Sequence, residues 1–397
     1  MKRYRIAVFH NLPPGGALRA LVSWTAVLSR FGDIDLYHMR GRRSEQFGLR
    51  EYIKNEFQYF FKPVSFKSRY LLFLRYVLNF INYFRYMLLS REIAAKMNAG
   101  SYDLIFMDFC MYYQLGPLPL FAKPPVVSRL HEYHRFVFEP PPSKSRYAGP
   151  DELLRRPYLS MLRRMNRKSV RKLKYIFSNS KYSRADILRI YGVNSELNYL
   201  WVDEKVFYPD PSAVKEKYFL TVGALSRVKG FEFVIEILSA LPENVRYPLY
   251  LVAPSRNEYA DELLTLSGRL NVELRIFCAL SNDALADMYR RAFLTVFTPE
   301  KEPFGYIPIE SMACGTPVIG ISEGGLLETV LDGETGFLCP RDARICAGKI
   351  EQLAADGKLY EAFCEKSLRW TKEMWIGTKG KERMEEGIKK MFKAIEK

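Results

Sequence analysis

Short apolar runs alternate along the chain with amphipathic segments of helical spacing, and turns that contain glycine separate them. The first run, RIAVFH at 5–10, leads through such a turn into a helical pattern and then into a second run, DIDLYHMR at 33–40. The alternation starts again with YFLTVGA at 218–224. Strands that alternate with helices form parallel sheets covered on both faces. The pattern therefore predicts an α/β protein with two doubly wound, Rossmann-like domains.

A segment with several prolines, VFYPDPSAV at 206–214, separates the two series of strands and indicates a linker. The expected domains are therefore 1–205 and 206–378, and a last helical pattern at 379–397 is expected to pack back toward the first domain. Parallel sheets of this kind bind ligands beyond the carboxyl ends of their strands. We expect the two domains to face each other across a ligand-binding cleft.

Composition narrows the choice of ligand and compartment. Of the 397 residues 48% are hydrophobic, and the formal net charge of +16 favours phosphorylated substrates, nucleic acid or anionic lipid as partners. The six cysteines form no C-x-x-C pair and only four histidines are present, which indicates a reducing, cytoplasmic compartment and no metal site. The first residues lack the long apolar run of a signal peptide.

The stretch that most resembles a membrane segment lies at residues 70–89 and has helical spacing. Four polar residues, Arg75, Asn79, Asn82 and Arg85, interrupt it at helical intervals. Because a spanning helix rarely contains such a set, the stretch predicts an amphipathic helix with a broad apolar face and a narrow polar stripe.

Two glutamates with seven residues between them mark the most unusual segment of the sequence. Glu302 lies in a loop broken by proline and glycine, and Glu310 follows Pro308, where a helix can begin because proline is tolerated in the first turn. Gly315 is expected to end that helix, which places Glu310 in its first turn. The helix N-terminus and the loop amides can aim hydrogen-bond donors at one ligand.

Glycine pairs precede two further helix starts. Gly324 and Gly325 lie before a second helical pattern, and Gly15 and Gly16 follow the first strand. Paired glycines at a helix N-terminus suit an anionic or polyhydroxylated ligand. Ordinary turns of an α/β protein, with glutamates that complement helix dipoles, would give the same pattern. The G-x-G-x-x-G and P-loop motifs are absent, which disfavours a nicotinamide enzyme and a P-loop ATPase.

Taken in order, the segment from Thr298 to Asp342 resembles the retaining glycosyltransferases of family 4. It contains the E-x7-E spacing, FG, ACGTPVI, GG, a glutamate and DGETGFL in that family's order. The stretches VVSRLHE at 126–132 and TVGALSRVKG at 221–230 match further family positions. The resemblance covers nearly the whole chain. It implies the GT-B architecture of two facing Rossmann-like domains and a nucleotide-diphosphate sugar as donor.

The resemblance also implies a role for each matching position. Glu302 would lie beside the transferred sugar, Glu310 would bind the ribose hydroxyls, and His131 would lie by the reacting sugar. Lys229 would contact the diphosphate together with amides of the glycine pairs. The implied catalytic residues are Glu302 and His131, and the implied donor-binding residues are Gly15, Gly16, Arg227, Lys229, Phe304, Gly305, Tyr306, Ile307, Glu310, Gly324 and Gly325.

These roles fit the chemistry of transfer from a nucleotide sugar. Negative charge develops on the leaving diphosphate, where a fixed lysine and helix N-termini stabilise it. The sugar becomes cation-like, which a carboxylate such as Glu302 can favour. The resemblance implies a front-face mechanism in which the leaving phosphate assists deprotonation of the acceptor, so the two-carboxylate logic of glycoside hydrolysis does not apply. Neither a cofactor nor a metal is expected.

Three positions depart from the family pattern. Ala224 stands where the family often has an arginine, and Arg227 either replaces that charge or is solvated. Trp201 stands where a glycine is expected, and SRNE at 255–258 replaces a G-x-G. Nearby loops usually frame the base, so the sequence leaves the base and the sugar of the donor open.

A basic segment adds an expectation about the acceptor. From Leu153 through Ala185 the chain has no Asp or Glu, and it carries Arg155, Arg156, Arg163, Arg164, Arg167, Lys168, Arg171, Lys172, Lys174, Lys181 and Arg184. A basic residue near an anionic membrane surface contributes about 1 kcal/mol. Together with the helix at 70–89, the segment predicts a first domain bound peripherally to the inner face of the cell membrane. The alternative is a solvated basic helix that packs over an aromatic core helix.

The sequence therefore predicts a retaining hexosyltransferase that uses a UDP- or GDP-sugar and a glycan or lipid-linked acceptor at the cytoplasmic membrane face. A first alternative is a soluble enzyme of the same architecture with a small sugar acceptor, of the sucrose- or trehalose-synthase type. A second is a basic nucleic-acid-binding protein, which no RNP-like, helix-turn-helix or zinc-finger motif supports. The acceptor, the linkage position and the oligomeric state are left open.

Overall fold

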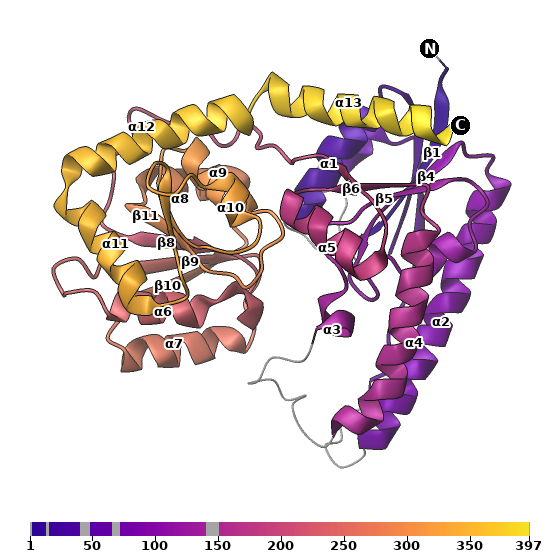
Figure 1. The fold of residues 1–397 in the computed structure, drawn as a ribbon, viewed down its shortest axis with the longest axis horizontal. Coiled ribbons are helices and arrows are strands. Elements are labelled where there is room, and N and C mark those ends of the chain that lie inside the picture. Colours follow the sequence, from indigo (N-terminus) through magenta and orange to yellow (C-terminus); the bar gives the residue numbers. More distant parts are fainter. Residues whose placement is uncertain (1, 13–15, 40–47, 66–71, 140–150, 397) are drawn as a thin grey trace. The chain divides into compact units, whose positions relative to one another are not determined.

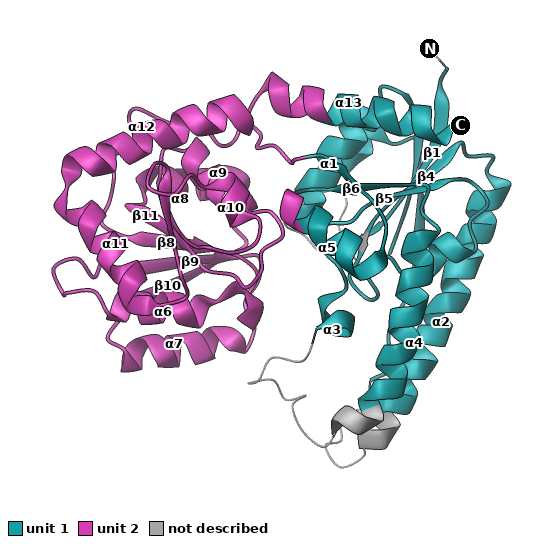
Figure 2. Cartoon of the chain, viewed as in Figure 1, with its two compact units in different colours: residues 1–179, 183–198, 384–397 teal, residues 180–182, 199–383 magenta. Residues whose placement is uncertain are grey.

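The computed structural model describes residues 2–12, 16–39, 48–65, 72–139 and 151–396 (Figure 1). The chain divides into two compact units, which Figure 2 shows in different colours. Unit 1 comprises Met1–Asn179, Ser183–Asn198 and Met384–Lys397, and unit 2 comprises Ser180–Tyr182 and Tyr199–Arg383. The linker segment 206–214 contains no helix or strand and belongs to unit 2.

Unit 1 is built on a seven-stranded parallel sheet with the strand order β3-β2-β1-β4-β5-β6-β7. The bounds of its strands are β1 Tyr4–Asn11, β2 Gly32–Met39, β3 Asn55–Tyr59, β4 Leu104–Cys110, β5 Val126–Arg129, β6 Tyr175–Ser178 and β7 Glu196–Leu197. Its helices are α1 Gly16–Leu28, α2 Leu72–Ala99, α3 Arg135–Phe138, α4 Asp151–Arg171 and α5 Lys181–Tyr191, with 3-10 turns at Leu49–Tyr52 and Leu118–Leu120. The first two residues of α5 are assigned to unit 2.

Unit 2 is built on a six-stranded parallel sheet with the order β10-β9-β8-β11-β12-β13. Its strands are β8 Phe219–Val222, β9 Leu249–Ala253, β10 Leu274–Cys278, β11 Leu294–Phe297, β12 Val318–Ile321 and β13 Gly336–Cys339. Its helices are α6 Phe231–Ser239, α7 Tyr259–Arg269, α8 Asn282–Arg291, α9 Tyr306–Ala313, α10 Leu326–Thr329, α11 Ala343–Ala355 and α12 Gly357–Met374, with a 3-10 turn at Arg227–Lys229. The last helix, α13 Thr378–Ile395, begins in unit 2, and its residues from Met384 onward belong to unit 1.

Both sheets have a point at which the strand order reverses, between β1 and β4 in unit 1 and between β8 and β11 in unit 2. Doubly wound sheets bind their ligands outside the carboxyl ends of the strands at this point. Gly16 starts the helix after β1, the 3-10 turn Arg227–Lys229 follows β8, and the loop with Glu302 follows β11. The prediction of an α/β fold with two doubly wound parallel sheets is confirmed.

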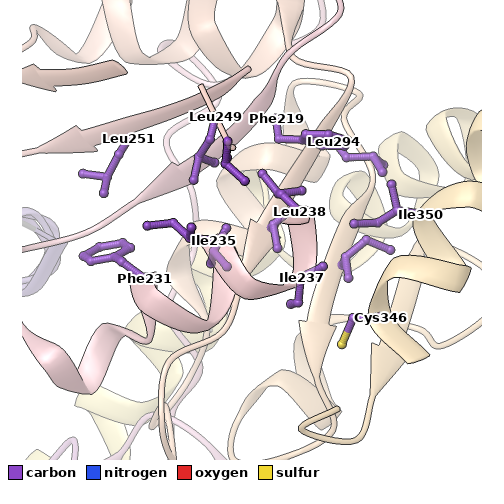
Figure 3. Close-up of a cluster of buried hydrophobic side chains, with 14 of the residues drawn as sticks. Phe219, Phe231, Ile235, Ile237, Leu238, Leu249, Leu251, Leu294, Cys346 and Ile350 are labelled. Atoms are coloured by element: carbon purple, nitrogen blue, oxygen red, sulfur yellow. The ribbon is translucent and has the colours of Figure 1, made fainter. Parts of the chain in front are cut away.

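The core of unit 2 fixes the strands that lead to this point. Phe231, Ile235 and Leu238 of α6 pack against Leu249 and Leu251 of β9, and all five side chains are buried (Figure 3). Full burial of an aliphatic or aromatic side chain stabilises the fold by about 1.5–3 kcal/mol. Helix α6 is thereby held against the sheet, and the turn that precedes it lies next to the end of β8.

Helix α2 is longer than the sequence pattern predicted, and it lies beside α4 in unit 1 (Figure 1). Tyr83 of α2 belongs to the same buried cluster as Tyr158 and Leu162 of α4, and Phe80 stacks edge-on against Tyr158. Within the described part of the chain, no helix has both the length and the apolar character needed to span a bilayer.

Part of the basic segment in α4 holds other helices of unit 1. Four of its arginines donate to main-chain carbonyls, Arg155 to Phe136 and Arg163 to Val137 in α3, Arg167 to Ile190 and Arg171 to Tyr191 in α5. The last carbonyls of a helix have no partner within it, so such side chains satisfy them. These arginines therefore contribute to the structure of unit 1, a role that charge patterning alone does not distinguish from a surface role.

A buried ion pair joins two central strands of unit 1. Asp108 of β4 accepts a hydrogen bond of 3.0 Å from Nε of Arg129 in β5, and both side chains are almost fully buried. The Arg129 guanidinium also lies 5.5 Å from the ring of Trp24 in α1. Removing one partner of such a pair leaves an uncompensated charge in the interior.

We expect Asp108→Asn to lower the free energy of unfolding by about 3–5 kcal/mol, because the Arg129 cation stays buried without its carboxylate. Asp33→Asn is the matched control, since Asp33 pairs with Arg3 and Lys54 at the surface and each such pair contributes at most about 1 kcal/mol. Urea denaturation of both variants measures the difference. Equal loss of stability in the two proteins would contradict the burial argument.

Candidate functional site

The candidate site in unit 2 consists of the segments that follow β8, β11 and β12. Lys229 ends the turn after β8, and its Nζ donates to Oε2 of Glu302, in the loop after β11, at 2.9 Å. The two side chains are 26% and 18% exposed, so a ligand can reach the pair. The structure therefore brings together the residues that the sequence assigned to the diphosphate and to the transferred sugar.

Gly230 holds the turn after β8 against the loop after β11. Its φ of +69° lies in the left-handed region, and its carbonyl accepts a hydrogen bond of 2.9 Å from Oγ1 of Thr298. A Cβ at this position would lie 2.2 Å from the carbonyl oxygen of Thr298, so only glycine fits. The amide of Glu300 adds a hydrogen bond of 2.9 Å to the carbonyl of Val228. These contacts determine where Lys229 lies.

The glycine pair after β12 packs directly on the loop that carries Glu302. The amide of Gly325 donates to the carbonyl of Glu302 at 2.7 Å. A Cβ on Gly324 or Gly325 would lie 2.4 Å from the backbone of Glu302 or Phe304, respectively. The helix that follows, α10, is a single turn of four residues. The pair therefore shapes the loop, in addition to any contact with a ligand.

Helix α9 begins earlier than the sequence predicted. Gly305, with φ +96°, precedes its first residue, Tyr306, and Pro308 lies within the first turn. Proline is tolerated there because the amides of the first turn have no partner inside the helix. Gly315, with φ +77°, follows the end of the helix as predicted. A Cβ at Gly305 would lie 2.8 Å from Oγ1 of Thr329.

Because α9 starts at Tyr306, Glu310 lies in the second turn of the helix and not in the first, as we had expected. Its side chain is fully buried, and its Oε2 accepts a hydrogen bond of 3.2 Å from the hydroxyl of Tyr289 in α8. A nucleotide ribose can therefore reach this carboxylate only if side chains around it move.

Aromatic side chains anchor the start of α9. Phe304 is buried, and its ring lies 5.5 Å from that of Trp375 and 6.2 Å from that of Tyr199. The hydroxyl of Tyr306 donates to the carbonyl of Trp201, one of the positions that depart from the family pattern. Ile307 is partly buried. The side chains of Phe304 and Tyr306 thus fix the backbone of a segment that the family resemblance assigned to donor binding.

Arg227 binds carboxylates other than Glu302. Its guanidinium donates to Glu232 of α6 at 2.8 Å and to Glu262 of α7, and lies 5.0 Å from the ring of Tyr259. These residues line an open hollow of about 560 Å³ between α6 and α7. Arg227 thus already has two carboxylate partners, and its side chain ties α6 to α7.

In unit 1 His131 follows β5 and is mostly buried. Its Nε2 lies 3.6 Å from Oδ1 of Asp108, the carboxylate that also binds Arg129. Its carbonyl accepts a hydrogen bond from Oγ of Ser183 in α5. The ring therefore lies with Nε2 near the buried carboxylate, at a distance longer than that of a hydrogen bond. Gly16 opens α1 as predicted, and Gly15 lies outside the described residues.

Sequence reasoning missed a buried polar group at the carboxyl ends of β1 and β2 in unit 1. Nδ1 of His10 in β1 accepts a hydrogen bond from the amide of Leu12 at 3.2 Å, and burial together with the nearby His38 lowers the pKa of His10 to about 4. His38 of β2 contacts Glu56 of β3 at 2.6 Å. His10 is neutral at physiological pH and positions the chain that leads toward Gly16. The available signal was a polar residue at the end of each buried apolar run.

A metal site was not expected, and that expectation stays a prediction. Among the residues that the structure describes, no three His, Cys, Asp or Glu side chains are grouped closely enough to hold a metal ion.

We expect Gly230→Ala to destabilise the protein by more than about 3 kcal/mol, because the backbone conformation and the contact with Thr298 both exclude a side chain. The control is Gly348→Ala in α11, where a Cβ would meet no described atom within 4 Å. Replacing a glycine inside a helix by alanine stabilises the protein by about 0.5–1 kcal/mol. Denaturation curves measure both changes. A Gly230→Ala protein as stable as the wild type would show that the turn after β8 is not fixed as described.

Comparison with known proteins relates part of the chain to a family. A family model described as glycosyl transferases group 1 matches residues 203–370. N-acetyl-alpha-D-glucosaminyl L-malate synthase of Bacillus anthracis is 28% identical over 179 residues, which is 43% of this chain. That alignment spans about half (46%) of the relative's own length.

Two solved structures are similar over both units. Sucrose-phosphate synthase from Thermosynechococcus elongatus superposes with a TM-score of 0.75 at 20% identity, over 99% of this chain and 100% of that one. HepE of Anabaena, in complex with UDP and glucose, gives 0.71 at 17% identity over 99% and 100%. These likenesses show the shared fold and confirm the predicted GT-B architecture. Residues 203–370 of the chain thus match the model of the glycosyl transferases group 1 family.

Proposed function

We propose that the whole chain is a retaining glycosyltransferase of family 4 that transfers a hexosyl unit from a UDP- or GDP-sugar to a glycan or lipid-linked acceptor at the inner face of the membrane. The observation that carries this proposal is the partly exposed Lys229–Glu302 pair, which lies at the strand-order reversal of a glycosyltransferase domain. The binding of UDP and glucose to HepE, a protein with the same fold, supports a nucleotide-sugar donor.

The donor diphosphate takes the place of Glu302 as partner of Lys229. A carboxylate and a phosphate are both anionic oxygen acceptors, so the ammonium group can exchange one for the other. As the bond between the sugar C1 and the phosphate oxygen breaks, the electron pair stays on the diphosphate, and Lys229 stabilises the charge that develops there. Glu302, released from the pair, then lies next to the cation-like sugar and favours it.

The backbone at the start of α9 receives the sugar. The amides of Phe304, Gly305, Tyr306 and Ile307 lie at the N-terminus of an eight-residue helix, where donors without helical partners suit hydroxyl oxygens. Glu310 exchanges its hydrogen bond with Tyr289 for one with a ribose hydroxyl. Donor binding therefore includes a local rearrangement around Glu310.

Residues of unit 1 complete the reaction in this proposal. His131, whose Nε2 lies 3.6 Å from Oδ1 of Asp108, is assigned to the reacting sugar. The amides near Gly15 and Gly16, together with those near the 324–325 pair, contribute to diphosphate binding. The acceptor oxygen bonds to C1 on the face that the diphosphate leaves, and its proton passes to the leaving phosphate oxygen. No metal is required for these steps.

A second candidate acceptor is a small soluble sugar. The likeness to sucrose-phosphate synthase extends over 99% of the chain and favours this alternative at the level of the fold. Both candidates share the donor chemistry, so one experiment on the donor tests both.

Glu302→Gln tests the proposed site. We expect transfer from UDP-glucose, UDP-N-acetylglucosamine or GDP-mannose to fall by about 10²–10³-fold, because the carboxylate no longer assists the transition state. Affinity for free UDP or GDP is expected to stay the same or rise, since Lys229 loses the carboxylate that competes with the diphosphate. The rate of transfer is measured from the amount of glycosylated product formed, and the affinity for UDP or GDP is measured by calorimetry. NMR of the product shows whether the anomeric configuration of the sugar is retained.

Glu334→Gln is the matched control, because it removes the same charge from an exposed pair with Lys366, 3.5 Å away in unit 2. We expect wild-type activity from it. The proposal fails if Glu302→Gln transfers sugar at the wild-type rate, or if the two variants lose activity equally.

A further inference from the structure

One side of α2 exposes large apolar side chains to solvent. Ile81, Phe84 and Leu88 are 43%, 49% and 63% exposed. Their spacing of three and four residues puts them on one side of the helix. Tyr83 and Tyr86, from the same stretch, are buried. The aromatic residues that made this stretch resemble a membrane segment thus belong largely to the core, and a different set faces outward.

An extended segment after β3 widens this apolar face. Oδ1 of Asn82 accepts the amide of Val64 and Nδ2 donates to its carbonyl, both at 2.8 Å. One helical turn later Arg85 donates to the carbonyl of Lys62 at 3.3 Å. The segment therefore runs antiparallel to α2, and its rise per residue places Phe60 near the level of Leu88. Phe60 is 67% exposed and Val64 46%.

Cations accompany the apolar side chains. Lys62 and Arg85 are exposed on the same two segments. Helix α4, which packs on α2, carries the exposed basic residues Arg164 and Lys168, and the exposed Lys172 follows directly after the helix. Arg164 is not among the arginines of α4 that bind main-chain carbonyls. Unit 1 thus combines an exposed apolar face with a surplus of positive charge.

Charge decides between the possible occupants of this face. A bilayer with anionic headgroups accepts apolar side chains in its acyl region and attracts cations at its surface. A second copy of this chain, which also carries a formal net charge of +16, would bring like charges together.

We propose that Phe60, Val64, Ile81, Phe84 and Leu88, which we call the α2 face, insert into an anionic lipid bilayer and dock unit 1 on it. The inference deepens the proposed function and rests on it, because a lipid-linked acceptor requires that the enzyme reach the membrane surface. The donor site in unit 2 does not depend on it, so the two proposals can fail separately.

The test is sedimentation of the full chain with vesicles of two parts phosphatidylcholine and one part phosphatidylglycerol. Phe84→Ser combined with Leu88→Ser is expected to lower the partition coefficient by at least about tenfold, because two exposed apolar side chains no longer enter the bilayer. The matched control replaces Val214 and Ile345, exposed apolar residues of unit 2, by serine and is expected to bind like the wild type. Pure phosphatidylcholine vesicles and added salt are expected to weaken binding.

Three results would overturn the proposal. They are a wild-type protein that does not sediment with the anionic vesicles, a double variant that binds as the wild type does, and a control variant that loses as much binding. A wild-type dimer in analytical ultracentrifugation that the double variant abolishes would assign the face to a second copy. UDP and GDP binding without vesicles, measured on the same variants, reports separately on the donor site and is expected not to change.

Discussion

The segments that follow β8, β11 and β12 must pack with their backbones in close contact, and the site in unit 2 depends on this constraint. At Gly230 a Cβ would lie 2.2 Å from the carbonyl oxygen of Thr298, and the 324–325 pair meets the loop of Glu302 almost as closely. Segments from three neighbouring strands are thereby fixed against one another. Lys229 reaches Glu302 as a consequence. The glycines in these segments are therefore required for close contact between backbones.

The two cations of one short turn have different environments. Lys229 pairs with a single carboxylate in a partly exposed position, so an anionic ligand can compete for it. Arg227 is held by Glu232 and Glu262 and ties α6 to α7. Ala224 removes a third cation that the family often has nearby. In our account Lys229 therefore offers positive charge to a diphosphate, and helix N-termini add to it.

Much of the fold could be predicted because its signals are local. Apolar runs of strand length, glycine turns and helical periodicity specify a doubly wound sheet, and Gly315 ends its helix where expected. The start of α9 could not be placed, since a proline in the first turn is compatible with more than one starting residue. Glu310 consequently lies one turn deeper in the helix than expected, where it is buried against Tyr289. Local sequence patterns do not predict how deeply a side chain is buried.

Contacts between segments far apart in the sequence were out of reach. Asp108 and Arg129 meet only because β4 and β5 are neighbours, and His131 lies close to the same carboxylate. The basic segment 155–184 was predicted from charge alone, and the structure divides α4 into arginines that bind helix carbonyls and basic residues that face solvent. The periodicity of the sequence predicts that these residues lie on a helix, but it does not predict which of them bind other helices and which face solvent.

The most direct measurement of the central claim is calorimetric binding of free UDP, GDP and ADP, without metal, to the wild type, Lys229→Met and Arg227→Met. The account predicts that one nucleotide binds clearly more tightly than the others. It also predicts that Lys229→Met weakens this binding at least about tenfold, because a charge-assisted contact with the diphosphate is lost, while Arg227→Met has little effect. If no nucleotide binds to the folded protein, or if the two substitutions cost the same affinity, Lys229 is not the diphosphate partner.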